Sequence, residues 1–117
     1  NNLCSATGLL VVAETLSLAE KFGIMPNTFI DVLNNSSGKN NSSENKFLQF
    51  ILSEKFNSGF RMDLMNKDIL TALKLANTFD VDFSLSQASI EKWKKAESEL
   101  ELGCDHTKIA AWQKKLS

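Results

Sequence analysis

The sequence predicts an all-α fold of about six helices in one bundle, and three observations support this class. Apolar residues recur at intervals of three and four, most clearly over residues 62–79, which is the spacing of one helix face. Proline occurs once and glycine five times in 117 residues, so helix breaks are few. Alternating runs of β-branched residues, which are typical of strands, are missing. A chain of this length can form one core, so we expect residues 1–117 to be a single domain.

The first predicted helix extends from Asn2 to Phe22 and ends at Gly23, a residue type that commonly terminates helices. Its apolar residues fall on nearly all sides instead of along one stripe. A helix with this pattern is buried nearly all round. Because so small a domain should not enclose a helix of that length by itself, we expect the excess apolar surface to contact a second subunit or another domain.

Caps and breakers define the next two helices. Pro26 suits the first turn of the second helix, because the N–H that proline lacks would be unpaired there. The polar residues 34–38 end that helix. A third helix is expected to begin near Asn41, which can form a capping box with Glu44, although a neighbouring serine could serve instead. Residues 57–59 then break the chain.

The second half of the chain predicts three more helices. The fourth covers residues 62–79, Ser84 is the expected N-cap of the fifth, and Asp105 is the expected cap of a short last helix. We expect the following residues to face the core: Met65, Ile69, Ala72, Ala76, Phe79, Leu85, Ile90, Trp93, Ala96, Leu100, Ile109, Trp112 and Leu116.

Composition argues against several classes of protein. The net charge is −1 and no basic patch is present, so we expect no nucleic-acid partner. The apolar run 8–13 is shorter than the ~20 residues that cross a bilayer, and we expect no membrane partner. Cys4 and Cys104 lie at opposite ends of the chain and are interpreted as reduced thiols. His106, the only histidine, has no second ligand nearby, so we expect no metal site and a solvated ring.

Four motifs, in order, resemble those of a known family. Asn1-Asn2 resembles the end of a Lys-x-x-Asn-Asn motif, and residues 13–23 resemble AEAxxLAxxxG. Residues 35–38 (NSSG) resemble the loop after the second helix, and residues 59–69 (GFRMDLMNKDI) resemble GFxxxLMxKDL, the most specific of the four. Together they resemble the C-terminal helical domain of the β-hydroxyacid dehydrogenase superfamily, of the 3-hydroxyisobutyrate dehydrogenase and tartronate semialdehyde reductase type, whose fold is that of the 6-phosphogluconate dehydrogenase C-terminal domain.

The resemblance implies an NAD- or NADP-dependent parent enzyme that moves a hydride between nicotinamide and the alcohol carbon of a short hydroxy acid. The cofactor-binding Rossmann domain and the catalytic lysine, three positions before Asn1, are expected outside this chain. The chain alone is therefore expected to hold no catalytic residue, to bind no cofactor and to be inactive. Members of the family are dimers or tetramers, so self-association is expected, in the cytoplasm or, in a eukaryote, the mitochondrial matrix.

Asn2 has the strongest case for a functional role. Residues four apart share a helix face, so Asn2 would point where the family's lysine points. Its amide could bind a substrate hydroxyl or carboxylate while accepting from the lysine ammonium. Asn1 is one position round the helix and could touch substrate or only support Asn2. The alternative for both is an ordinary polar helix start.

The segment before and within the fourth helix supplies the other candidates. In the resembling family, the lysine at the position of Lys67 reaches the nicotinamide end of the cofactor; the alternative is an exposed pair with Asp63. Asp68 is expected to support the site through a hydrogen bond to another helix or to backbone. Phe60 could shape the pocket wall or simply pack in the core.

Two rival functions stay open on the sequence. The domain could be a non-catalytic dimerisation or interaction module whose parent lacks the lysine. It could also be the related helical domain of an imine reductase, which generally lacks the same lysine. The loop 36–38 could border the active-site cleft or only cap the second helix.

Overall fold

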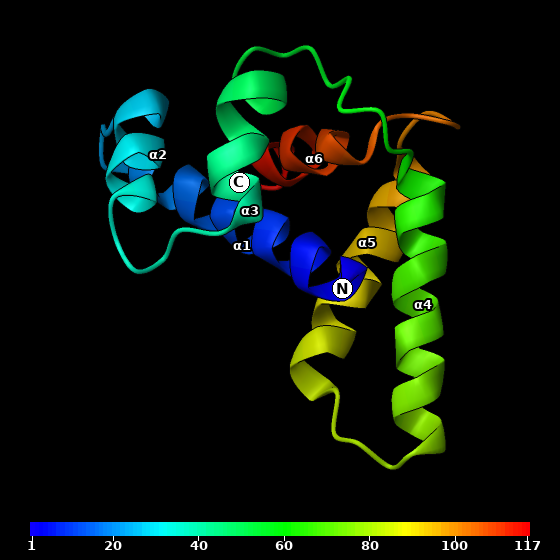
Figure 1. The fold of residues 1–117 in the computed structure, drawn as a ribbon. Helices are drawn as coiled ribbons and strands as arrows, with labels where there is room; N and C mark the ends of the chain where they lie inside the picture. The colour runs from blue at the N-terminus through cyan, green and yellow to red at the C-terminus, as the bar shows by residue number, and fades with distance from the viewer.

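The computed structural model describes all 117 residues, and the predicted all-α class is confirmed (Figure 1). Its elements are α1 (Asn2–Lys21), α2 (Pro26–Asn34), α3 (Asn41–Asn45), the π-helical turn η1 (Phe47–Ile51), α4 (Met62–Thr78), α5 (Ser84–Glu99), the 3₁₀ turn η2 (His106–Lys108) and α6 (Ile109–Lys115). The only β-type pairing is an isolated bridge between Arg61 and Asp105, which joins the approach to α4 to the start of η2.

Helix α1 is the centre of the bundle and contacts each of the other five α-helices. It supplies Ala6, Leu9, Leu10, Val12, Ala13 and Leu16 to the core. The expectation that this chain could not enclose α1 was wrong for most of its large apolar residues, because the short helices α2, α3 and α6 cover faces that the hairpin of α4 and α5 leaves open. The expected contact of the remaining apolar surface with a second subunit or domain stays a prediction. Among the large apolar side chains of α1, only Val11 (50% exposed) and Leu18 (60%) stay uncovered, followed by Phe22 (80%) at the C-cap.

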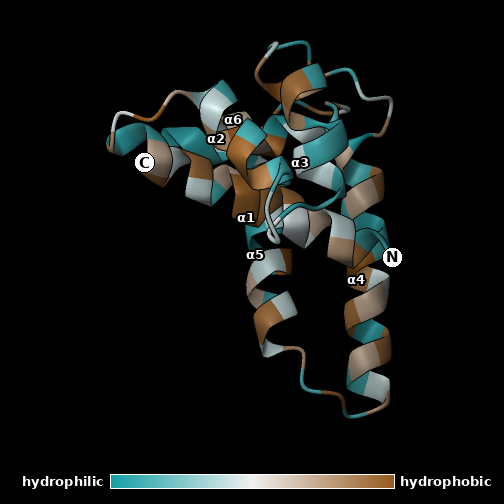
Figure 2. Ribbon diagram, turned by 60° about the vertical axis from the view of Figure 1, so that its left-hand side comes forward, coloured by the Kyte–Doolittle hydropathy of each residue, from teal (hydrophilic) through white to brown (hydrophobic).

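By length and composition alone, α1 could also cross a membrane. Its position in the bundle gives a sufficient reason for its apolar composition, because most of its large apolar side chains belong to the core of the same chain. Figure 2 shows α1 in the middle of the bundle, among the other helices.

The start of α3 differs from the expectation. The N-cap is Asn40, and its capping box is closed by Ser43 instead of Glu44. The Ser43 backbone N–H donates to Asn40 Oδ1 and the Asn40 N–H donates to Ser43 Oγ, both at 2.9 Å. The chain then passes from α3 into the π-helical turn, where the Leu52 N–H donates to the carbonyl of Phe47. This turn buries Phe47 and Ile51 in the core and leaves Lys46 at the junction.

Helices α4 and α5 form a hairpin whose far end projects beyond the rest of the bundle (Figures 1 and 2). Phe79 and Leu85, which were expected to face the core, are 72% and 81% exposed. The helical periodicity of α4 and α5 is sound, but α1 does not extend far enough to cover these positions. Nearer the bundle, the predicted core residues Ile69, Ile90, Trp93 and Ala96 are buried. The prediction for Leu116 was wrong, because this residue is the C-cap of α6 at the end of the chain and is exposed.

Candidate functional site

The predicted site residues of the first and fourth motifs meet at the N-terminal end of α1. The Asn2 side chain donates through Nδ2 to Asp68 Oδ2 on α4, at 2.5 Å. Asn1 precedes the helix as its N-cap and donates to Asn2 Oδ1 at 3.2 Å. Asp68 thus forms a helix-to-helix hydrogen bond of the kind expected from the sequence, and this bond fixes the Asn2 amide relative to α4.

Phe60 and Lys67 lie on either side of the start of α4. Phe60 is half-buried, packs on the core and meets the His106 ring edge-on at 5.7 Å between centroids. Lys67 is exposed on α4, directly before Asp68, and its ammonium has no hydrogen-bond or ion-pair partner in the chain. The alternative of a Lys67–Asp63 pair was wrong, because Asp63 instead binds the Arg61 guanidinium at 2.6 Å.

A groove of about 300 Å³ opens beside Asn2. It lies between α1, the α3–η1 junction and the segment that leads into α4. Its lining residues are Asn2, Ser5, Asn45, Lys46, Phe50, Ser58, Phe60, Met65 and His106. A second groove of about 240 Å³, at the other end of α1, is lined mainly by apolar side chains and contains none of the predicted site residues. A further groove of about 390 Å³ contains only Asn1 of the predicted site residues, whereas the groove beside Asn2 contains Asn2 and Phe60 and is therefore the candidate site.

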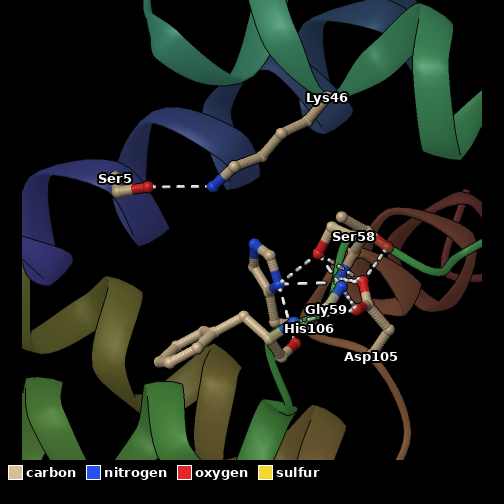
Figure 3. A network of polar contacts seen from close by, with 8 residues as sticks. Ser5, Lys46, Ser58, Gly59, Asp105 and His106 are labelled. Atoms are coloured by element: carbon tan, nitrogen blue, oxygen red, sulfur yellow. Dashed lines mark hydrogen bonds and ion pairs between the residues drawn. The ribbon is translucent and has the colours of Figure 1, made fainter.

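Asp105 holds the floor of this groove in place (Figure 3). Its carboxylate accepts from Ser58 Oγ at 2.9 Å, from the backbone N–H groups of Gly59 (3.0 Å) and Phe60 (3.3 Å), and from the N–H and hydroxyl of Thr107. Burial alone would raise the pKa of Asp105, but the hydrogen bonds from Thr107 and Ser58 outweigh it and hold the pKa below its ordinary value. The result is a rigid turn that presents Phe60 to the groove.

His106 is buried, with 2% of its surface exposed, so the expectation of a solvated ring was wrong. Its ring stacks on Trp93, and Nδ1 lies 3.0 Å from the Phe60 carbonyl oxygen. Because a carbonyl only accepts, Nδ1 carries the proton in this arrangement and Nε2 is an acceptor. Nε2 is buried and has no partner in the chain. Burial, and then the nearby charge of Lys46, lower the pKa of His106, which favours the neutral ring.

Lys46 is the charged residue of the groove. It is half-buried and donates through Nζ to Ser5 Oγ on α1, at 3.0 Å. No carboxylate of the chain forms an ion pair with it. Burial lowers the pKa of Lys46, and the more distant charge of Asp105 offsets part of that effect.

Three polar residues of this region, Lys46, Asn66 and His106, were not predicted from the sequence to belong to the site or the core. Lys46 and His106 are far apart in the chain, and only the packing of η1 and η2 brings them to one groove. Asn66, buried between α4 and α5, donates to the carbonyls of Met62 (3.3 Å) and Trp93 (3.2 Å) and was also missed. Asn66 could have been found from the sequence, because it is a polar residue on an otherwise apolar helix face. Lys46 showed no such signal, because charged residues near helix ends are usually solvated.

Comparison with known proteins gives consistent results. Residues 1–113 match the sequence family described as NAD-binding of NADP-dependent 3-hydroxyisobutyrate dehydrogenase. The chain is 35% identical over 86 residues to 2-(hydroxymethyl)glutarate dehydrogenase of Eubacterium barkeri, with 74% of the chain covered. It is 33% identical over 101 residues to a probable mitochondrial 3-hydroxyisobutyrate dehydrogenase of Arabidopsis thaliana, with 81% covered. The chain spans 29% of the length of each of these relatives.

Two solved structures share the fold. One is 3-hydroxyisobutyrate dehydrogenase of Mycobacterium tuberculosis with L-serine, with a TM-score of 0.82 and 22% identity over 96% of this chain and 40% of that one. The other is 3-hydroxyisobutyrate dehydrogenase of Salmonella typhimurium, with a TM-score of 0.84 and 17% identity over 95% of this chain and 39% of that one. At these identities the likeness concerns the fold alone.

Proposed function

The chain belongs to the family of NAD-binding domains of NADP-dependent 3-hydroxyisobutyrate dehydrogenase, and from this premise we propose that it is the C-terminal helical domain of an NAD(P)-dependent hydroxy-acid dehydrogenase. In this reaction the alcohol carbon of a short hydroxy acid gives a hydride to the nicotinamide ring, and the hydroxyl proton passes to a general base. That base is proposed to be a lysine three positions before Asn1, with the cofactor's phosphates bound by a Rossmann domain outside this chain. The reverse reaction reduces the corresponding semialdehyde or ketone.

The Asn2–Asp68 hydrogen bond is the observation that carries the proposal. An asparagine side chain has two N–H donors and two acceptor lone pairs. One donor of Asn2 is used by Asp68 and one acceptor site by Asn1, which leaves one N–H and one lone pair. The free N–H can bind a substrate oxygen, and the free lone pair can accept from a lysine ammonium one helical turn earlier. Asn2 is thus held in one orientation with the two free groups that this role requires.

Phe60 and Lys67 extend the same site. Phe60 lines the groove next to Asn2 and is proposed to form the apolar wall against the carbon chain of the substrate. Lys67 lies beside Asp68 with an unpaired ammonium at the surface, and is proposed to contact the cofactor across the cleft between the two domains. Asp68 and Asn1 support Asn2, and Asn1 is also close enough to the helix start to touch substrate.

The remaining apolar surface of α1 supports a proposal of self-association. Val11, Leu18 and Phe22 are spaced by seven and four residues, so they lie on one side of the helix, and Ile24 and Met25 continue the exposed apolar surface. A symmetric contact between two copies would cover this surface, and a dimer or tetramer of the parent enzyme is proposed to form through it.

Turnover by the complete protein tests this proposal. The complete protein, assayed with NAD or NADP and a panel that includes 3-hydroxyisobutyrate, is expected to reduce the cofactor, which is followed by the absorbance of the reduced nicotinamide. The 117-residue chain alone is expected to give no turnover in the same assay. Activity of the chain alone, or a residue other than lysine three positions before Asn1 in the complete gene, would contradict the proposal and favour the non-catalytic module.

A further inference from the structure

The groove beside Asn2 holds two polar groups that hydride transfer does not use. They are the Lys46 ammonium and the Nε2 atom of His106, which both line the groove with Asn2. Figure 3 shows the Lys46 side chain reaching across to Ser5 on α1, with the His106 ring below it and turned so that one nitrogen faces Asp105 and Ser58 while the other points away from them.

Lys46 is a cation without a counter-ion. An ammonium has three N–H donors, and only one is used, in the bond to Ser5. Asp105 is the carboxylate whose charge acts on Lys46, but it forms no ion pair with it and already accepts hydrogen bonds from Ser58, Gly59, Phe60 and Thr107. A partly desolvated charge with free donors is costly unless a polar or anionic group completes its shell. Nothing in the chain does so.

His106 adds an unused acceptor to the same wall. Its Nδ1 is occupied by the Phe60 carbonyl, and its Nε2 is buried without a partner. Because the ring is fixed by Trp93 and Phe60, Nε2 cannot turn away to another partner. A ligand hydroxyl, or a water molecule held by a ligand, could donate to it.

Lys46 contacts α1 further along the helix than Asn2, the residue proposed to bind the reacting end of the substrate. Ser5, which Lys46 contacts, follows Asn2 by three residues, or about 4.5 Å along the helix axis. A molecule whose reacting end is bound by Asn2 would therefore extend along α1 towards Lys46. A short carbon chain is enough to connect the two positions.

We propose that Lys46 binds a second carboxylate of the substrate, so that the preferred substrates are short hydroxydicarboxylic acids instead of hydroxymonocarboxylic acids. This inference rests on the proposed function, because Asn2 defines the reacting end of the substrate. Lys46 is then a specificity-determining residue, and His106 Nε2 accepts a hydrogen bond from the hydration shell of the bound carboxylate. The carboxylate supplies the anion that Lys46 lacks.

Carboxylate binding can be measured on the 117-residue chain itself, independently of any enzymatic activity. The chain is titrated with glutarate, and with the neutral glutaramide at matched ionic strength, while ¹H–¹⁵N NMR spectra are recorded. Glutarate is expected to shift the resonances of Ser5, Lys46 and His106 saturably in the millimolar range, and glutaramide is not. Lys46→Met is expected to abolish the shifts, whereas Lys74→Met, which removes an exposed lysine of α4, is expected to keep them. Shifts that persist in Lys46→Met, or no saturable shifts in the unmodified chain, would overturn the proposal.

Kinetics of the complete enzyme test the substrate class. The matched pair is 3-hydroxyisobutyrate and 2-(hydroxymethyl)succinate, which differ only in that a methyl hydrogen is replaced by a carboxylate. The dicarboxylate is expected to be preferred in kcat/KM by about tenfold or more, since a charge-assisted hydrogen bond contributes at least that much. Lys46→Met should remove the preference for the dicarboxylate, whereas Lys74→Met, which lies outside the groove, should leave both the preference and the activity on 3-hydroxyisobutyrate unchanged.

The two ways of failing are distinguishable. Turnover of 3-hydroxyisobutyrate with no preference for the dicarboxylate, or a preference that survives in Lys46→Met, would overturn the role of Lys46 and leave the dehydrogenase function intact. No turnover of any hydroxy acid would refute the proposed function, and with it the claim about substrates, whatever the NMR titration shows about carboxylate binding.

Discussion

The two ends of α1 differ in what surrounds them. At the N-terminal end, Asn2 and Ser5 are bound by side chains from α4 and from the α3–η1 junction, next to a polar groove. Towards the C-terminal end, Leu18 and Phe22 are apolar and exposed, and no other segment of the chain covers them. The middle of the helix is buried in the core, which holds both ends in place. One helix can therefore position a polar site at its start and offer an apolar contact surface near its finish, with a shared core between them.

Removing core volume from the middle of α1 should damage both ends together and give the largest effect. Leu9→Ala deletes a fully buried side chain and is expected to lower the free energy of unfolding by about 2–5 kcal/mol. Val11→Ala, two residues away and half exposed, should change it by less than about 0.5 kcal/mol. Urea denaturation of the two variants measures the difference, and a similar small loss in both would mean that α1 is not the centre of the core.

Placing charges on the exposed apolar surface at the C-terminal end of α1 should distinguish the role of this end from that of the N-terminal end. The double substitution Leu18→Glu and Phe22→Glu is expected to weaken self-association of the complete protein at least about tenfold, because it places carboxylates in an apolar contact. Sedimentation equilibrium measures the dissociation constant. Leu102→Glu, at another highly exposed apolar residue, is the control and should leave it unchanged. Equal self-association in the double variant and the unmodified protein would show that this surface is not the contact.

The pH dependence of stability should report on the N-terminal end, with a smaller effect. The pKa of His106 is lowered below its ordinary value of 6.5 in the folded chain, so the unfolded chain binds the proton first as pH falls. Stability is therefore expected to fall as pH decreases below 6.5, by at most about 1.4 kcal/mol per pH unit. His106 is the only histidine, so His106→Gln should flatten the curve between pH 6.5 and 5. A slope in this range that is the same in both proteins would contradict a buried neutral ring.

Local signals predicted the helices well, because the features that start and stop them lie in adjacent residues. Pro26 and Gly23 fixed helix boundaries almost to the residue. The capping of α3 was assigned one residue late, since several polar residues in that stretch can cap a helix and only the contact between Asn40 and Gly8 on α1 selects among them. The exposure of Phe79 depends on where the neighbouring helix ends, and the apolar periodicity of α4 gives no information about that position.

The candidate site was predictable only in part. Asn2 and Asp68 were identified through their motifs, and the structure places them in one hydrogen bond. Lys46 and His106 belonged to no motif, and their proximity arises from the packing of two short irregular turns. The enclosure of α1 by its own chain was also missed, because the sequence does not show how much area short helices can cover.

Substituting Asn2 in the complete enzyme tests the central claim most directly. Asn2→Ala removes the groups proposed to bind substrate and lysine, and is expected to lower kcat on the order of 100-fold because the reacting groups lose their alignment. Asn77→Ala, at an exposed asparagine of α4 without side-chain hydrogen bonds, is the matched control and should keep full activity. A kcat for Asn2→Ala equal to that of Asn77→Ala, with both variants folded by circular dichroism, would contradict the assignment of the substrate site to the N-terminal end of α1.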